Sequence, residues 1–370
     1  MANILVLNPK VPFSRGGQDL LVRTLVLNLK KRGHIVDTIS LPFNPLPKTG
    51  LIKQAALWRS LSLEEFAGQK VNLVIATKFP SYWARHPRKS LWLVHQHRPL
   101  YELTASRYSD LSDSPQDQTL RELLIKGDEK SLKECRYRAC ISKNVQKRLQ
   151  HFCQISSDVL YPPLKYEELP AGRKNFNSDN IYILSVGRLC AIKRVDLVIK
   201  ALPYTPPYVK LKIVGSPDEP GILEYLETEI SKHDLWNRVE FIKGISDEEL
   251  KELYQNALCV CFLPYDEDYG YVTLESICQG TPVITAKDSG GALEFITNME
   301  TGLVVEPKPE AVGKAISLLE SNRELALKLG ENGKRYIEKN KDIFLASAWD
   351  RVINLLLSPL KEDLNEREAV

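Results

Sequence analysis

Two carboxylates, Glu267 and Glu275, stand eight positions apart with Gly270 between them. The apolar run at residues 257–263 is typical of a buried strand, and a helix is expected to open at Tyr271. At such a junction a glycine lets the backbone approach a ligand closely, and the first N–H groups of the helix can bind phosphate oxygens. A carboxylate about one turn inside the helix, such as Glu275, can accept hydrogen bonds from both hydroxyls of a ribose. The segment therefore suits a nucleotide diphosphate, although acids that only favour the helix dipole would leave the same pattern.

Two cations lie close to the end of another expected strand. Arg188 follows the apolar run at residues 181–186, and Lys193 comes five residues later, near the start of the next helix. Ligands of open α/β sheets bind at the carboxyl ends of the strands. A pair of cations beside a helix N-terminus would clamp a diphosphate there. The alternative interpretation is a pair of solvated surface charges.

Two metal sites are alternative interpretations of nearby residues. The acidic run 266–268 would suit a hard cation, and His95 with His97 would suit a transition metal. Both are disfavoured, because Arg188 and Lys193 already supply the positive charge that a metal would provide. No metal or other cofactor is expected.

Strands alternate with helices in two separate series, which predicts two α/β units with parallel sheets and helices on both faces. A helix over residues 18–31 follows the first strand, another covers residues 195–202, and Ser246 with Glu249 forms a capping box that opens a third. The expected strands comprise residues 4–7, 35–41, 71–76 and 90–94 in the first series, and residues 181–186, 210–214, 239–242, 257–263 and 282–285 in the second.

The boundary between the two domains is expected near Tyr161-Pro162-Pro163, where the double proline interrupts regular structure. This divides the chain into residues 1–161 and 162–342. A last helix at about residues 343–357 follows, and the C-terminal stretch at about 343–370 is free to pack back on the first domain.

The charge is divided unevenly between the halves of the 370-residue chain. Residues 1–160 carry a net charge of +12 and residues 161–370 carry −9, so the total is only +3. The basic half is either ordinary solvated surface or a surface for something anionic, such as a membrane or a phosphorylated acceptor. No apolar run approaches the roughly 18 residues of a spanning helix, and no signal peptide is recognised. Seven cysteines without a CxxC motif favour reduced thiols and a cytoplasmic protein, possessing at most peripheral contact with the inner face of a membrane.

The segment from Glu267 through the eighth following residue, Glu275, and on to residues 280–284 resembles the EX7E segment of retaining GT-B glycosyltransferases, family 4 (group 1). The resemblance covers about the last 190 residues; the first half resembles the family mainly through its first strand and Gly16-Gly17. Tyr269 stands where phenylalanine is usual, and Ser276 where alanine is usual. Further segments that resemble the family are residues 185–189 with Lys193, 214–216, 241–246, 290–294 and 301–304.

The resemblance implies a GT-B fold, which has two Rossmann-like doubly wound domains facing across a cleft. It implies that Glu275 holds the ribose hydroxyls, that Arg188 and Lys193 neutralise the leaving diphosphate, and that Glu267 contacts the donor sugar. The complete set of implied donor-binding residues is Gly16, Gly17, Gly215, Lys243, Ile245, Gly270, Tyr271, Val272, Thr273 and Glu275.

The resemblance also implies a catalytic histidine in the first domain, just after a strand. His95 and His97 follow the expected strand at residues 90–94 and face the same way on an extended segment. His97 is favoured because it lies farther past the strand end. In the alternative, one of the two is a buried, hydrogen-bonded histidine. Arg98 could assist a phosphate or an acidic acceptor.

The predicted function is transfer of a hexose, with retention, from a nucleotide diphosphate sugar to a hydroxyl of a sugar, lipid-linked or small-molecule acceptor. A UDP-sugar is favoured as the donor, with GDP-mannose next, and no nucleic acid partner is expected. Two alternatives are a non-catalytic nucleotide- or sugar-binding protein on the same scaffold and a Rossmann oxidoreductase. The oxidoreductase is disfavoured, because the first turn at residues 8–17 lacks GxGxxG.

Overall fold

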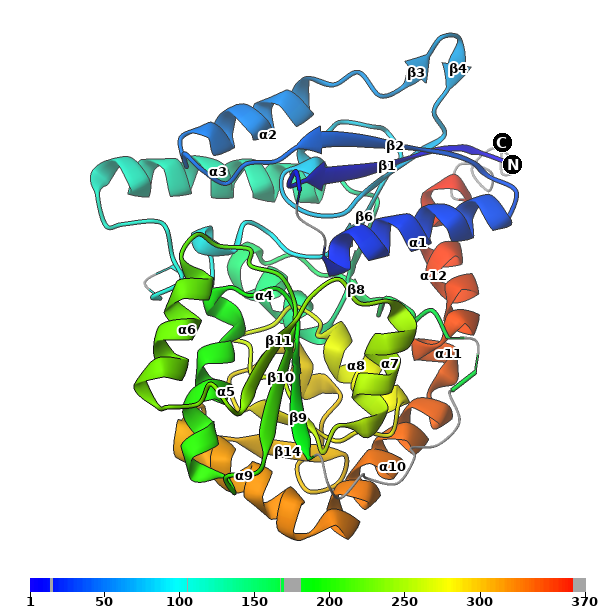
Figure 1. Cartoon of the computed structure of the whole chain (residues 1–370). Coiled ribbons are helices and arrows are strands. Elements are labelled where there is room, and N and C mark those ends of the chain that lie inside the picture. The colour runs from blue at the N-terminus through cyan, green and yellow to red at the C-terminus, as the bar shows by residue number, and fades with distance from the viewer. Residues whose placement is uncertain (14–15, 105, 167, 170–180, 362–370) are drawn as a thin grey trace. The chain divides into compact units, whose positions relative to one another are not determined.

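The computed structural model describes residues 1–361 apart from residues 14–15, 105, 167 and 170–180. It divides into two compact units (Figure 1). Unit 1 comprises residues 1–163 together with the C-terminal stretch from Ala348, and unit 2 comprises residues 164–347. The chain therefore leaves unit 1, forms unit 2 and then returns to unit 1.

A parallel sheet forms the centre of unit 1, with the strand order β2-β1-β5-β6-β7-β8. Val6 of β1 lies opposite Thr38 of β2 on one side and Ile75 of β5 on the other. The central strands β5 and β6 are buried throughout, as expected for strands covered on both faces. The strands are β1 (Asn3–Lys10), β2 (Ile35–Pro42), β5 (Leu73–Ala76), β6 (Lys89–Leu93), β7 (Tyr137–Cys140) and β8 (Asp158–Val159), with a separate hairpin of β3 (Glu65–Phe66) and β4 (Gln69–Lys70).

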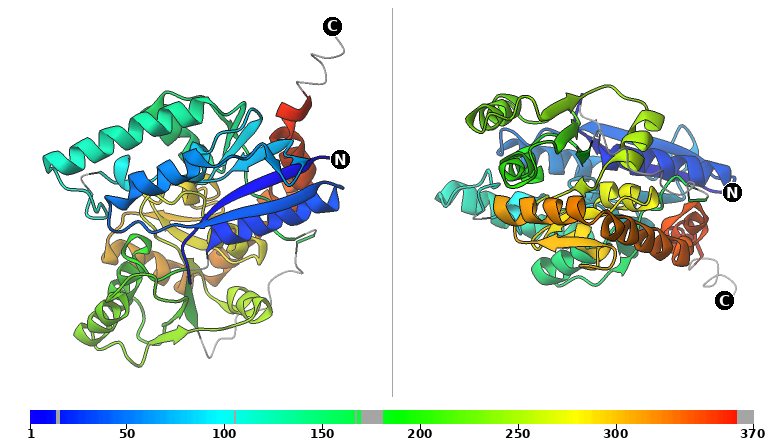
Figure 2. Two further views of the ribbon diagram at one scale, coloured as in Figure 1. Left: turned by 90° about the horizontal axis from the view of Figure 1, so that it is seen from above. Right: turned by 60° about the horizontal axis from the view of Figure 1, so that its bottom comes forward.

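Helices cover this sheet through apolar stripes. In α1, Leu21, Leu25 and Leu29 recur every four residues and are buried, so the helix packs along β1 and β2 (Figure 2). Helix α12 (Trp349–Leu356) contacts α1 and β6, where Trp349 meets Trp92 edge to face at 5.9 Å between ring centroids. The α-helices of unit 1 are α1 (Gly17–Lys31), α2 (Gly50–Ser60), α3 (Pro115–Lys133), α4 (Lys143–Cys153) and α12 (Trp349–Leu356).

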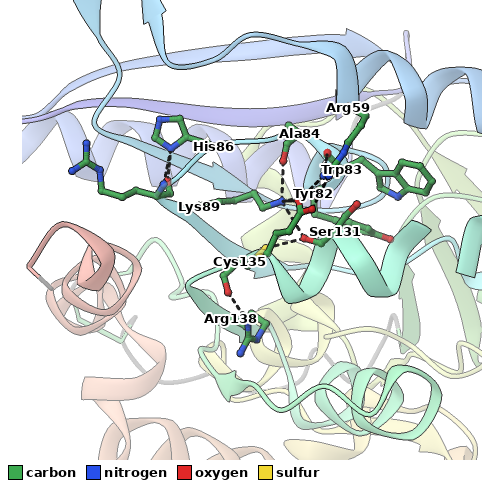
Figure 3. A network of polar contacts seen from close by, with 11 residues as sticks. Arg59, Tyr82, Trp83, Ala84, His86, Lys89, Ser131, Cys135 and Arg138 are labelled. Atoms are coloured by element: carbon green, nitrogen blue, oxygen red, sulfur yellow. Dashed lines mark hydrogen bonds and ion pairs between the residues drawn. The ribbon is translucent and has the colours of Figure 1, made fainter. Parts of the chain in front are cut away.

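A buried lysine joins three elements of unit 1 (Figure 3). Lys89, the first residue of β6, is fully buried, and its Nζ donates to the carbonyl oxygens of Tyr82 (2.8 Å), Ala84 (2.8 Å) and Ser131 (3.0 Å). The three donors of the ammonium group are thus all used, which offsets the cost of burying it. Burial lowers the pKa of Lys89. Lys89 therefore ties β6 to the segment before it and to α3.

Unit 2 contains a second parallel sheet with the order β11-β10-β9-β12-β13-β14. Leu184 of the central strand β9 lies opposite Lys212 of β10 and Val260 of β12. Counted along the chain this is the order 3-2-1-4-5-6, which reverses direction between β9 and β12. That reversal is the point at which open α/β sheets bind ligands. The strands are β9 (Tyr182–Val186), β10 (Lys210–Val214), β11 (Val239–Ile242), β12 (Val260–Cys261), β13 (Val283–Ala286) and β14 (Gly302–Val305).

The helices of unit 2 follow its strands. The predicted capping box is confirmed at the start of α7, where Glu249 N donates to Ser246 Oγ (3.2 Å) and Ser246 N donates to the Glu249 carboxylate (2.7 Å). The α-helices are α5 (Val195–Ala201), α6 (Ile222–Lys232), α7 (Asp247–Asn256), α8 (Tyr271–Cys278), α9 (Pro309–Ser321), α10 (Arg323–Lys339) and α11 (Lys341–Phe344).

The prediction of one continuous last helix over residues 343–357 is wrong. The segment contains the end of α11, an extended Leu345 (φ −95°, ψ 178°), a short 3₁₀ turn and then α12. Phe344 packs between Phe295 and Tyr336 in unit 2, whereas Trp349 packs in unit 1. The chain must cross between two cores here, so the helix is interrupted. Among the described residues, no helix is long and apolar enough to cross a membrane.

Candidate functional site

Three loops meet at the point where the strand order of unit 2 reverses. They are the β9 turn (residues 187–194), the β12 loop (residues 262–270) and the β13 loop (residues 287–291), and each follows the carboxyl end of its strand. Backbone hydrogen bonds join them, from Tyr265 N to Ile192 O (2.8 Å), Asp266 N to Asp288 O (2.8 Å), Glu267 N to Ser289 O (3.2 Å) and Gly291 N to Glu267 O (2.7 Å).

The β12 loop leads into α8 through Gly270, as predicted. Gly270 has φ +92°, a conformation that favours glycine, and an added Cβ would lie 3.3 Å from Ala292 Cα. Tyr271 and Val272 open the helix, and first-turn N–H groups have no acceptor within a helix. One detail of the prediction is wrong: Thr273 N donates to Gly270 O (2.9 Å), so its N–H group is already used. The N–H groups that this helix offers to a phosphate are therefore those of Tyr271 and Val272.

Both predicted phosphate-binding cations form ion pairs with carboxylates. Lys193 Nζ contacts Glu267 Oε2, and Arg188 Nη1 contacts Asp218 Oδ2. Lys193 is mostly buried and lies 5.4 Å from the ring centroid of Phe262, whereas about half of the Arg188 side chain is exposed. The structure thus brings Lys193 and Glu267 together beside the start of α8.

Glu275 lies on the second turn of α8 and interacts with tyrosines. Its Oε2 accepts a hydrogen bond from the hydroxyl of Tyr254 (3.0 Å), a buried residue of α7. Removal from water raises the pKa of Glu275, and the hydrogen bond from Tyr254 acts in the opposite direction. The negative charge of Glu275 contributes to raising the pKa of Tyr166 to about 12, after the larger effect of burial. One carboxylate oxygen of Glu275 is thus held in place by Tyr254.

The remaining predicted donor residues of unit 2 lie at neighbouring strand ends. Gly215, at the end of β10, packs against Gly187: an added Cβ would stand 1.9 Å from the Gly187 carbonyl oxygen. A glycine is thus required there by the close approach of two strand ends. Lys243 is exposed and Ile245 is half-buried, both in the loop that follows β11. They remain candidates for the base-binding side of the site.

The residues predicted from the first domain lie in unit 1, on separate elements. Gly16 precedes α1 and Gly17 is its first residue; Gly16 N donates to the carboxylate of Asp19 (3.2 Å). His95 and His97 follow β6, with His95 half-buried and its Nδ1 2.7 Å from Gln96 O.

His97 is the more deeply placed of the two histidines. Its side chain is 7% exposed, its ring lies 5.5 Å from that of Phe79 and 6.3 Å from that of Phe43, and its Nε2 is buried without a hydrogen-bond partner among the described residues. Burial lowers the pKa of His97 to about 4, against the opposing charge of Asp110. The imidazole is therefore neutral at pH 7, and its buried Nε2 has unused hydrogen-bonding capacity among the described residues.

Three residues of the site were not predicted: Asp218, Tyr254 and Arg194. Arg194 is buried at the end of the β9 turn, where its guanidinium binds the β12 and β13 loops. In the sequence it follows Lys193 and resembles one more solvated cation. Its positive φ and its distant partners leave no local pattern, so only the folded chain reveals them.

Within the described ranges, no cluster of three or more His, Cys, Asp or Glu side chains is arranged to hold a metal ion. Within the acidic run 266–268, Asp266 has φ +46° and the carboxylate of Glu267 is paired with Lys193. The three carboxylates therefore do not gather into one metal-binding group.

The sequence of unit 2 is similar to that of a known protein family. Residues 168–336 match the family model described as "Glycosyl transferases group 1". The human alpha-1,3/1,6-mannosyltransferase ALG2 is 28% identical over 249 residues, which cover 60% of this chain and 57% of ALG2. The D-inositol 3-phosphate glycosyltransferase of Mycobacteroides abscessus is 29% identical over 176 residues, covering 43% of this chain and 39% of that protein. The chain thus spans about half the length of the curated relatives it matches.

Solved structures match over nearly the whole chain. Sucrose-phosphate synthase from Thermosynechococcus elongatus has a TM-score of 0.80 at 19% identity, covering 98% of this chain and all of that one. Anabaena HepE in complex with UDP-glucose has a TM-score of 0.71 at 18% identity, covering 97% of this chain and all of that one. At this level of identity the likeness shows the fold alone. The predicted GT-B class, with two parallel-sheet α/β units, is confirmed.

Proposed function

We propose that this chain, which belongs to the group 1 glycosyltransferases, transfers a hexose from a nucleotide diphosphate sugar to a hydroxyl group, with retention of the anomeric configuration. One observation carries the proposal: Lys193 and Glu267 lie together beside the start of α8, whose second turn presents Glu275. In such a donor the diphosphate joins the ribose to the sugar. A cation of the β9 turn correspondingly lies beside the nine-residue segment 267–275, which has a carboxylate for the sugar at one end and a carboxylate for the ribose at the other.

In this reaction the bond from the anomeric carbon to the phosphate oxygen breaks, and negative charge grows on the leaving diphosphate. Arg188, Lys193 and the first N–H groups of α8 are the groups that would receive this charge. Because they are held in place by the fold, they stabilise the transition state more than the ground state. Removing one preorganised donor of this kind typically raises the barrier by about 2.7–4 kcal/mol. Retention would follow if the acceptor hydroxyl attacks from the side of the departing phosphate, to which it passes its proton.

The ion pairs of the site have a part in this scheme. When a diphosphate binds between Lys193 and the start of α8, Glu267 is released from its ion pair and can accept hydrogen bonds from hydroxyls of the donor sugar. The carboxylate and the cation thereby serve neighbouring groups of the same donor. The paired state also keeps two mostly buried charges compensated before the donor arrives.

The donor is proposed to be a UDP-hexose, with GDP-mannose as the next choice. The matched HepE structure holds UDP-glucose, and the matched ALG2 is a mannosyltransferase by name. The acceptor is proposed to carry a hydroxyl on an anionic or lipid-linked molecule, since residues 1–160 have a net charge of +12. Peripheral contact with an anionic membrane would follow from the same charge. Binding of anionic vesicles that does not weaken with added salt would count against this electrostatic part.

The test begins with UDP, GDP, ADP, TDP and their common sugars, scored by thermal shift and confirmed by calorimetry. One diphosphate is expected to raise the melting temperature, because it binds only the folded state. Glu275→Ala should abolish that shift. Donor hydrolysis or transfer should proceed in the presence of EDTA, since no metal cofactor is proposed. A chain that binds a nucleotide sugar but never turns it over would be a binding protein and not an enzyme.

A further inference from the structure

Arg194, the last residue of the β9 turn, has a backbone conformation that arginine rarely adopts. Its φ of +52° and ψ of +41° lie in the left-handed region, which favours glycine. Its side chain is only 6% exposed. A large charged side chain is thus retained at a position where a residue without a side chain would be less strained. Such strain persists only where surrounding contacts compensate for it.

The compensating contacts all lead to the two neighbouring loops of the candidate site. In the β12 loop, Nε donates to Leu263 O (2.6 Å) and Nη2 donates to Pro264 O (2.8 Å). In the β13 loop, Asp288 accepts from Nη1 (2.8 Å) and from Nη2 (2.6 Å) in a bidentate pair. The planar fork of arginine suits this set of acceptors, and a lysine could not reproduce it.

These contacts hold the residues that are proposed to bind the donor. The backbone oxygens at Leu263 and Pro264 stand immediately before the part of the β12 loop that carries Glu267 and leads to Gly270. Lys193, which pairs with Glu267, is the residue directly before Arg194. One guanidinium therefore fixes the start of the β12 loop relative to the turn that supplies its cation.

Glu275 is held separately from this network. It lies on the second turn of α8, and its carboxylate is oriented by Tyr254 of α7. A disturbance of Arg194 should thus reach the groups for the diphosphate and sugar, while the group for the ribose keeps its own support.

We propose that Arg194 is a positioning residue, which sets the β12 loop for the diphosphate and the sugar of the donor without touching either. This inference rests on the proposed function, because it assumes that the β12 loop binds a nucleotide sugar. The expected effect of Arg194 is selective. A nucleoside diphosphate should bind more tightly than its nucleoside, and the nucleotide sugar more tightly again, and these two gains in affinity should depend on Arg194. The affinity for the nucleoside itself should not depend on it.

The test measures this gain with uridine, UDP and UDP-glucose, or with the guanosine series if GDP is the diphosphate that binds. Calorimetry or ligand-observed NMR gives each dissociation constant for the wild type, Arg194→Gln and Arg194→Gly. In both variants the ratio of the nucleoside constant to the diphosphate constant is expected to fall at least tenfold, with the nucleoside constant within about twofold of the wild type. Arg194→Gly also relieves the backbone strain, so its loss would come from the side-chain contacts alone.

Arg238 offers a matched control in the same unit. It donates to Val209 O (3.0 Å), Pro206 O (3.0 Å) and Thr205 Oγ1 (2.7 Å), away from the three loops of the site. Arg238→Gln should lower the stability of unit 2 and leave the ratio of the two constants unchanged. Asp288→Asn, which keeps the shape of the bidentate partner, should reduce the ratio in the same direction as Arg194→Gln and by less.

Two results would overturn the inference. In one, the Arg194 variants keep the wild-type ratio; in the other, nucleoside and diphosphate affinities fall by the same factor, as they would for a purely structural arginine. Failure of the proposed function has a different signature, because then the wild type itself binds none of the nucleotides and no ratio exists.

Discussion

Two buried groups of unit 1 should give the protein opposite responses to pH, and replacing either one should reveal the other. Burial lowers the pKa of His97 from 6.5 to about 4. Burial also raises the pKa of Asp128 from 3.8 to about 6, although Tyr82, Trp83 and Tyr101 donate hydrogen bonds to its carboxylate at 2.6–2.8 Å. The first group resists taking up a proton, and the second resists losing one.

The sign of each effect follows from which state binds more protons. Between pH 4 and 6.5 the unfolded chain protonates His97 more readily than the folded chain does, so His97 makes the free energy of unfolding increase with pH. Between pH 4 and 6 the folded chain keeps the proton of Asp128 that the unfolded chain loses, so Asp128 makes the free energy of unfolding decrease with pH. At about 1.36 kcal/mol per pKa unit, each contribution amounts to about 3 kcal/mol. In the wild type the two should largely cancel.

The assay is urea unfolding from pH 4 to pH 7, followed by tryptophan fluorescence. Four of the five tryptophans lie in unit 1, so the signal reports mainly on the unit that contains both groups. Relative to the wild type, His97→Gln should be about 3 kcal/mol more stable at pH 4 than at pH 6.5, and Asp128→Asn should show the reverse trend. The control is His233→Gln, which repeats the same substitution at an exposed position in unit 2.

A flat difference for His97→Gln would refute the reasoning about the buried imidazole. It would mean that His97 is as easily protonated in the folded chain as in the unfolded one, and that a ring cation is present near neutral pH. The neutral state assigned to the His97 ring at pH 7 would then have to be abandoned.

The other predictions concern the site and the core. Tyr254→Phe removes the hydroxyl that orients Glu275 and that lowers the pKa of its carboxyl group. Calorimetry should therefore show nucleotide affinity falling about tenfold or more, with a larger loss at pH 6 than at pH 8. An equal loss at both pH values would contradict this. Gly270→Ala should weaken diphosphate binding several-fold in the same assay with little change in the unfolding midpoint, because the strain falls on the turn before α8. Lys89→Met leaves three buried carbonyl oxygens without their donor and should lower the free energy of unfolding by about 3–5 kcal/mol in urea; a loss under about 1 kcal/mol would show that these carbonyls find other partners.

Much of the fold could be predicted because buried parallel strands have a strong local signal. The strands at residues 210–214 and 239–242 have the predicted bounds, because each ends where a glycine-containing turn follows. The opening of α8 after Gly270 was predictable for the same local reason, because a glycine is needed at its positive φ.

The interactions of the site could be predicted only in part. The sequence places Arg188, Lys193 and Glu267 at strand ends, but their ion pairs depend on loops that meet only in the folded chain. Asp218 lies thirty residues from Arg188, and Tyr254 lies on a different helix from Glu275. The two-residue strand β8 is equally invisible, because Asp158 and Val159 become a strand only by pairing with β7. The interruption at Leu345 could not be predicted either, because the residues before it pack in unit 2 and the residues after it pack in unit 1.

The return of the chain to unit 1 at Ala348 has a consequence for biosynthesis. Unit 2 is an insertion between the first 163 residues and the helix α12 that completes unit 1. The ribosome therefore delivers all of unit 2 before it delivers Trp349, which packs on Trp92, and Leu356, whose carbonyl oxygen accepts from Ser90 Oγ (2.6 Å). During translation the side of β6 that α12 contacts therefore stays uncovered while the sheet of unit 2 forms. A chain that is released from the ribosome after residue 347 should thus contain a finished unit 2 and an unfinished unit 1, and limited proteolysis of such chains should cut the first 163 residues before the remainder.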